Sequence, residues 1–192
     1  EDGFKRWVAV NFLDLEYIFP RMIERLKKSK YQIAVTQHGK RELEKAGFKP
    51  FYAPLGVDTN LFEPDAALRK LQRDKRGWKD DIFVVGVVGI NYVTDRKNYI
   101  GTLKAFQRFH QRHPDSILYL HTDVIGTATQ GLPLQFIMNA CGFEATGVGP
   151  VQYVDQKNYH LWLIPQEELA RVYNAFDVMC LPSHGEGFGM PW

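Results

Sequence analysis

The 192-residue sequence predicts an α/β protein whose β-sheets are parallel and carry helices on both faces. Two features support this fold class. Short runs rich in β-forming residues alternate with segments of helical hydrophobic periodicity, which is the pattern of consecutive βαβ units. One run, residues 82–89 (IFVVGVVG), is almost wholly apolar, as expected for a central parallel strand that is covered on both faces.

The first part of the chain reads as strand, helix, strand, helix, strand, which predicts one parallel βαβαβ unit. Pro20 lies where the first turn of a helix accepts proline, and Gly47 is suited to the end of the second helix. The expected strands are residues 6–12, 31–36 and 49–54, and the expected helices are residues 15–29 and 39–48.

The second part continues the alternation after residues 54–65, a loop with two prolines and a glycine. We interpret this loop as a boundary between two layers or domains, and an ordinary loop is the alternative. In the helix that follows the apolar strand, Tyr99, Leu103 and Phe106 share one face, and His110 lies at its edge. The expected strands are residues 82–89, 117–123, 160–165 and 177–182, the last one buried, and the expected helices are residues 66–76, 99–110, 132–142 and 166–176.

Composition and charge restrict the classes of function. The 24 basic and 22 acidic residues give a formal net charge of +2 and are spread along the chain, so nucleic acid is not an expected partner. Cys141 and Cys180 lie in no CxxC or Cys/His cluster, which indicates buried free thiols in a reducing compartment. No apolar run approaches the ~20 residues of a membrane span, and the expected location is the cytoplasm.

The stretch SHGEGFGMP, residues 183–191, is the most informative loop. It follows the last expected strand and ends at Pro191, a residue favoured in the first turn of a helix, so it reads as a strand-to-helix loop. Gly187 and Gly189, which flank Phe188, allow the backbone to approach a ligand closely, and Glu186 supplies a carboxylate. A tight turn without a ligand is the alternative interpretation of this glycine-rich loop.

A second loop, residues 89–98 (GINYVTDRKN), leaves the carboxyl end of the expected central strand, where ligands of open α/β sheets bind. It places Lys97 near a helix N-terminus, and a fixed cation together with helix-end N–H groups can stabilise a diphosphate without a metal. Arg96 is the weaker candidate, because neighbouring side chains on a helix point about 100° apart. The sequence has no Asp-x-Asp pair positioned to chelate a metal diphosphate, so no metal site is expected.

Four stretches resemble, in this order, the retaining GT-B glycosyltransferases of the glycosyltransferase 4 type. They are PLGVDTNLF (residues 54–62), VVGINYVTDRKN (87–98), LARVYNAFDVMCLPS (169–183) and EGFGMP (186–191). The resemblance runs from about Trp7 to Trp192 and implies a GT-B-like fold with Rossmann-type parallel sheets, incomplete at both ends. It implies that residues 1–54 complete the acceptor-side domain and that residues 55–192 form a truncated donor-side domain.

The resemblance also implies roles for individual residues. The implied contacts are Gly89, Asn91, Arg96 and Lys97 with the donor diphosphate, and Glu186, Gly187, Phe188, Gly189 and Met190 with the donor sugar. Glu186 is the expected catalytic-site residue, and it holds sugar hydroxyls rather than transferring a proton. The sequence departs from the family pattern at Ile90, where arginine is usual, and at Leu55, where asparagine is usual. The second glutamate of the family motif would fall two positions beyond Trp192.

The leading hypothesis is a retaining, metal-independent hexosyltransferase that moves a sugar from a nucleoside-diphosphate sugar to a hydroxyl acceptor and needs no other cofactor. The alternatives are a nucleotide-sugar binding domain without catalysis and a GT-B-type nucleotide-sugar epimerase. A dinucleotide oxidoreductase is disfavoured because the chain has no GxGxxG fingerprint. We expect a fragment of a longer protein that is inactive alone and prone to self-association, and a peripheral membrane contact of the full-length protein stays open.

Overall fold

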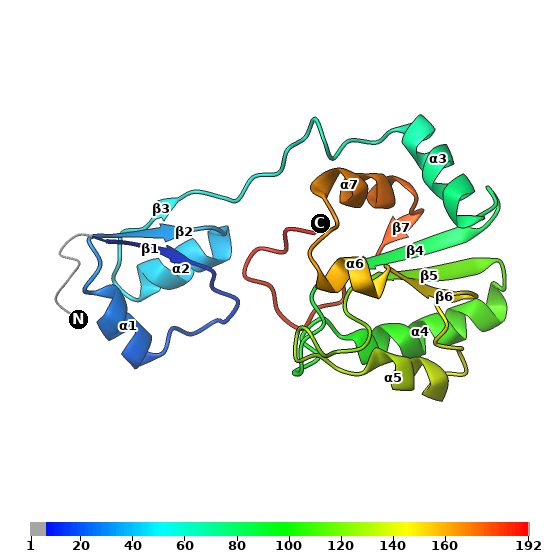
Figure 1. The fold of residues 1–192 in the computed structure, drawn as a ribbon. Coiled ribbons are helices and arrows are strands. Elements are labelled where there is room, and N and C mark those ends of the chain that lie inside the picture. The colour runs from blue at the N-terminus through cyan, green and yellow to red at the C-terminus, as the bar shows by residue number, and fades with distance from the viewer. Residues whose placement is uncertain (1–6, 192) are drawn as a thin grey trace. The chain divides into compact units, whose positions relative to one another are not determined.

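The computed structural model describes residues 7–191 of the chain. These residues form two compact units, each with a parallel sheet of its own (Figure 1). The first unit runs to Val57 and includes Gly185–Met190, and the second comprises Asp58–His184 with Pro191. No helix within the described residues is both long enough and apolar enough to cross a membrane.

The first unit has the predicted βαβαβ arrangement. Its elements are β1 (Val8–Asn11), α1 (Pro20–Leu26), β2 (Tyr31–Ala34), α2 (Gln37–Lys45) and β3 (Phe51–Tyr52). The strands pair in the order β1-β2-β3 and all run parallel. Leu13, Ile18, Leu26 and Leu43 are buried in the small apolar core of this unit.

Helix α1 is shorter than the predicted helix of residues 15–29. Phe19 has a φ of −58° and a ψ of 141°, because proline disfavours the α region for the residue that precedes it. The chain therefore becomes helical only at Pro20. Helix α2 ends as predicted, with Gly47 in the left-handed region at a φ of 88°.

The second unit alternates helices with strands. Its elements are α3 (Ala66–Arg76), β4 (Phe83–Val88), α4 (Tyr99–Arg112), β5 (Ser116–His121), α5 (Leu134–Ala140), β6 (Val151–Tyr153), α6 (Gln156–His160), α7 (Gln166–Asn174) and β7 (Val178–Met179). The described strands pair in the order β6-β5-β4-β7, and all are parallel. The apolar run of residues 82–89 is thus an interior strand, as predicted.

Helices cover both faces of this sheet, which confirms the predicted layers (Figure 1). On one face, Val87 and Leu118 pack with Leu103 of α4 and with residues of α5. On the other face, Val84 packs with Phe176 and with residues of α7. Alternate residues of each strand therefore serve two separate apolar clusters.

The predicted strand of residues 160–165 is wrong. His160 ends α6, and the three apolar residues that follow, Leu161, Trp162 and Leu163, are exposed, Trp162 by 90%. Trp162 also has a φ of 55°, in the left-handed region, which is incompatible with a strand. The strand at this place in the sheet is β6, and α6 begins shortly after it because the Asp155 carboxylate accepts the N–H of Asn158 at 2.7 Å.

Strand β7 is shorter and less buried than predicted for residues 177–182. It pairs with β4 at one edge of the described sheet, and Val178 is 43% exposed. Cys180 is consequently only partly buried, and this burial raises the pKa of its thiol. Cys141 is buried, as expected, and both thiols are free.

The carboxylate of Asp177 ties α3 to the amino end of β4. It accepts hydrogen bonds from the N–H of Val84 at 2.7 Å and from Arg73 Nη1 at 3.2 Å, and it pairs with Arg69 at 2.5 Å. Arg73 is 1% exposed, so its guanidinium needs this counter-charge. Burial by itself raises the pKa of Asp177, but the Val84 N–H and the two guanidinium groups outweigh burial and hold the pKa below its usual value.

Gly86, in the middle of β4, has no room for a side chain. A Cβ there would lie 2.1 Å from the ring of Phe176. We expect Gly86→Ala to lower the free energy of unfolding by about 1–3 kcal/mol, the typical range for overpacking a core, as measured by urea denaturation. Gly56→Ala is the matched control, because no atom of the described residues lies within 4 Å of a Cβ at Gly56. Equal unfolding free energies for the two variants would contradict this packing.

Candidate functional site

The strands of the second unit all end at one edge of the sheet, because they run parallel. The connections that leave this carboxyl edge follow β4, β5, β6 and β7. Ligands of open α/β sheets bind at such edges. The residues predicted to bind the diphosphate all lie on the first of these loops, and they are Gly89, Asn91, Arg96 and Lys97.

Gly89 and Lys97 lie together at the end of β4. The hydroxyl of Tyr99 donates to the carbonyl oxygen of Gly89 at 2.6 Å. A Cβ added at Gly89 would lie 3.4 Å from Cε and 3.5 Å from Cδ of Lys97. Lys97, which is 6% exposed, therefore packs its aliphatic stem on the strand end. Its ammonium group is thus held at the carboxyl edge of the sheet.

Side chains of the same loop close the first turn of α4. Asp95 accepts a hydrogen bond from the N–H of Tyr99 at 2.7 Å, and Asn98 accepts one from the N–H of Gly101 at 3.2 Å. Asp95 and Asn98 have left-handed φ angles of 48° and 57°. Side chains of the protein therefore already accept hydrogen bonds from helix-end N–H groups that the sequence analysis had assigned to an anion. An anion at this site would bind mainly to the cationic side chains.

Asn91 faces the protein interior and is 0% exposed. Its amide nitrogen donates to the carbonyl oxygens of Asp123 at 2.8 Å and Leu132 at 2.6 Å, and its amide oxygen accepts the N–H of Leu132 at 3.0 Å. Its backbone N–H donates to Thr122 Oγ1 at 2.9 Å. Because these bonds use its donors, Asn91 braces the loops after β4 and β5, and it is not part of the site that we propose below.

Arg96 is exposed beside the buried Lys97, as expected for neighbours that point apart. Its carbonyl oxygen accepts the N–H of His184 at 2.8 Å, which joins the loop after β7 to the loop after β4. The hydroxyl oxygen of Ser183 is buried and has no hydrogen-bond partner within residues 7–191. A buried hydroxyl in that state is costly unless a ligand or solvent group satisfies it. The sequence analysis placed Ser183 at the start of its most informative loop but gave it no role.

The stretch Gly185–Met190 is part of the first unit. It contains the predicted sugar-binding residues Glu186, Gly187, Phe188 and Gly189, which are partly buried, and Met190, which is exposed. Gly189 has a φ of 82°, a conformation that glycine adopts without strain. A Cβ at Gly187 would lie 2.9 Å from Cβ of Phe12, so the chain itself needs a glycine there. The helix that Pro191 is predicted to begin lies outside the described residues.

Asp123, a buried carboxylate, organises the loop after β5. It accepts the N–H of Gly126 at 2.8 Å and of Ala128 at 2.9 Å, and its Oδ1 lies 3.0 Å from Nε2 of His160. Burial by itself raises the pKa of Asp123, but these N–H groups and His160 outweigh burial and lower it. The sequence analysis missed Asp123, because it took this residue as the end of the expected strand of residues 117–123, whereas β5 ends at His121.

Acidic side chains at this edge cap backbone segments. Asp95 caps α4, and Asp123 caps the loop after β5. In the part of the chain that the structure describes, no group of three or more His, Cys, Asp and Glu side chains is placed to hold a metal ion.

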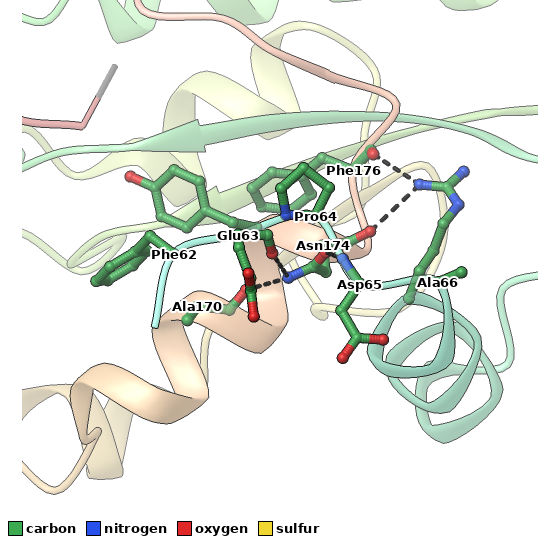
Figure 2. A pocket seen from close by; sticks show the side chains of 10 residues that line it. Phe62, Glu63, Pro64, Asp65, Ala66, Ala170, Asn174 and Phe176 are labelled. Carbon is green, nitrogen blue, oxygen red and sulfur yellow. Dashed lines mark hydrogen bonds between the residues drawn. The ribbon is translucent and has the colours of Figure 1, made fainter. Parts of the chain in front are cut away.

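A hollow of about 510 Å³ lies away from this edge, between α7 and the segment before α3 (Figure 2). Apolar rings, among them Phe62 and Phe176, form much of its wall. Asn174 closes it by accepting the N–H of Asp65 at 2.7 Å and donating to the carbonyl oxygen of Glu63 at 3.1 Å. These bonds fasten the segment to α7, and we assign the hollow to packing rather than to a ligand site.

Matches to known proteins are by structure. No protein-family model matches the chain, and no curated protein matches it. HepE (Alr3699) of Anabaena, solved with UDP and glucose, has a TM-score of 0.69 at 16% identity over 96% of this chain and 48% of its own. A glycosyltransferase of Rickettsia africae has a TM-score of 0.64 at 12% identity, over 92% of this chain and 45% of its own.

A third structure is the C-terminal domain of a glycosyl transferase group 1 family protein (LpcC) from Francisella tularensis. Its TM-score is 0.51 at 18% identity, over 71% of this chain and 63% of its own. The chain thus spans about half the length of the Anabaena and Rickettsia proteins. Two of these structures are named as glycosyltransferases, and the similarity confirms the GT-B-like fold predicted from the sequence. A shared fold leaves function to be argued from the site.

The bracing role of Asn91 predicts a stability effect. Asn91→Ala leaves the N–H of Leu132 and two buried carbonyl groups without their partner, so we expect a loss of at least about 1–3 kcal/mol of unfolding free energy in urea denaturation. Asn60→Ala is the control, because Asn60 is exposed in the same unit. If Asn91 were a ligand contact only, its variant would unfold like the control.

Proposed function

We propose that the second unit binds the diphosphate of a nucleoside-diphosphate sugar and that the chain belongs to a glycosyltransferase. The observation that carries this proposal is the position of Lys97, buried against Gly89 at the end of an interior strand. Lysine binds phosphate groups as a point charge, and ligands of open α/β sheets bind at the carboxyl edge. Diphosphate binding at this edge is therefore the chemistry that the site supports best.

The cation would act on the leaving group. Cleavage of the bond between the sugar and the β-phosphate leaves growing negative charge on phosphate oxygens. A positive charge fixed in a partly dry site stabilises that charge more strongly than one in open water. Lys97 supplies the charge, and the Ser183 hydroxyl supplies a hydrogen bond. The exposed Arg96 adds attraction at longer range.

A uridine-diphosphate sugar is the donor that we favour. The Anabaena protein of similar fold was solved with UDP, with UDP and glucose, and with UDP-glucose, which supports this choice. Ile90 stands where the family resemblance expects arginine, so the diphosphate depends more heavily on Lys97. Transfer to a hydroxyl acceptor, retention of configuration and independence of metal follow from the family resemblance and are part of the proposal.

The stretch Gly185–Met190 is assigned to the donor sugar. The Glu186 carboxylate can accept hydrogen bonds from two sugar hydroxyls and so fix the orientation of the ring. We assign Asp58–His184 to the donor side of the enzyme and the strands of the first unit to the acceptor side.

The proposal predicts that UDP binding depends on Lys97. Lys97→Ala should weaken binding by about 1.5–3 kcal/mol in isothermal titration calorimetry, the range for a charge-assisted hydrogen bond. Lys104→Ala, an exposed lysine on α4, should bind UDP like the unaltered chain. EDTA should leave the affinity unchanged, because Lys97 rather than a divalent metal neutralises the diphosphate.

Two results would refute this assignment. One is equal UDP affinity for the Lys97 and Lys104 variants. The other is UDP binding that appears only when manganese or magnesium is added.

A further inference from the structure

A cavity of about 330 Å³ lies on the face of the second sheet that carries α3 and α7. Side chains of α3, α6, α7, β5 and β6 line it. The residues assigned above to the donor are not among them, since Gly89, Lys97 and Ser183 lie outside its lining. The cavity therefore needs an explanation of its own.

The imidazole of His121 forms part of the floor, at the end of β5. His121 is 8% exposed, and its Nδ1 is buried without a hydrogen-bond partner among the described residues. Its ring is fixed by an edge contact with Tyr159, with the ring centroids 5.8 Å apart. Burial, and then the charge of Arg76, lower the pKa of His121 to about 4, so the ring is neutral near pH 7. A buried nitrogen in this state calls for a ligand or solvent partner.

The guanidinium of Arg76 stands in the wall of the same cavity. Its central carbon lies 5.5 Å from the ring centroid of Trp78 and 5.4 Å from that of Tyr119. Arg76 also donates to the side chain of Gln72, and its side chain is 17% exposed. The aromatic rings thus hold in one orientation a planar group whose N–H donors match the oxygens of a carboxylate or phosphate.

The carboxylates of this wall are already engaged by cations or by the backbone. The Glu168 carboxylate is shared by three cations, at 3.4 Å from Lys75, 4.0 Å from Arg76 and 3.6 Å from Arg171. The other carboxylate of the lining, Asp155, caps α6. The lining therefore holds two cations and two carboxylates, and Arg171, which lies outside the lining, adds the third positive charge that makes the surroundings favour an anion.

We propose that this cavity binds a small oxyanion, the phosphate or carboxylate group of a metabolite. Arg76 provides the ionic contact through its planar fork. His121, in the tautomer that carries its proton on Nδ1, donates the second hydrogen bond. The rim lysine, Lys75, adds charge at the entrance. No covalent step is involved.

The test is a titration of the unaltered chain with inorganic phosphate at constant ionic strength, followed by the NMR signals of the histidine rings. The His121 signal, identified by its loss in His121→Gln, should shift and saturate. Arg76→Gln should weaken phosphate binding at least about tenfold, as expected for loss of a charge-assisted bond. Arg112→Gln, an exposed arginine on α4, is the matched control and should bind like the unaltered chain. Lys75→Gln, at an exposed rim position, gives a second test with a smaller expected loss.

A second titration with acetate shows whether the cavity binds a carboxylate as well as a phosphate. A saturating shift of the His121 signal with either anion supports the proposal. A His121 signal that stays constant or drifts linearly with both anions overturns it. Displacement of phosphate by UDP also overturns it, because the cavity would then be part of the donor site. This test stays independent of the proposed function, since loss of UDP binding in Lys97→Ala leaves the response of His121 to phosphate unchanged.

Discussion

The ion pair between the buried Arg73 and the partly exposed Asp177 is the interaction on which the second unit depends. One carboxylate receives the backbone of β4, a fully buried guanidinium from α3 and a second guanidinium from Arg69. Removing the carboxylate leaves the buried guanidinium of Arg73 without its counter-charge, and such a loss typically costs about 3–5 kcal/mol for a fully buried pair. The pair fixes the amino end of β4, and the carboxyl end of this strand carries Gly89 and the candidate site. The geometry of the site thus rests on an anchor at the opposite end of the same strand.

At the carboxyl end of the sheet, polar side chains fix the loops that follow the strands. Asn91 and Asp123 satisfy backbone groups of the loops after β4 and β5, and Asp95 closes the start of α4. Fully satisfied buried networks of this kind hold loops rigid. Rigid loops keep a cation such as Lys97 in place before a ligand arrives, so little energy is spent on ordering the site during binding. Asn91, Asp123 and Asp95 therefore have structural roles although they lie in loops at the edge where ligands bind.

The sequence was sufficient for the parts of the fold that follow from periodicity. Residues 82–89 were recognisable as an interior strand because a parallel strand that is covered on both faces has an almost continuous apolar sequence. The loop positions of Lys97 and Gly89 followed from that strand. Periodicity failed at residues 160–165, where exposed apolar side chains imitate a strand, and it missed β6, which has three residues. Periodicity could not decide whether Asn91 braces the loops or binds a ligand. The answer depends on partners such as Leu132, which is 41 residues away in the sequence.

The central claim is that the carboxyl edge of the second sheet binds the diphosphate of a donor sugar. Amide chemical shifts in two-dimensional ¹H–¹⁵N spectra test it most directly, with UDP and UDP-glucose added to separate samples. The account predicts that UDP shifts the amides of residues 89–98 and 183–184, and that UDP-glucose also shifts those of Gly185–Met190. Shifts confined to the cavity of His121 and Arg76, or spectra unchanged by both compounds, would contradict it.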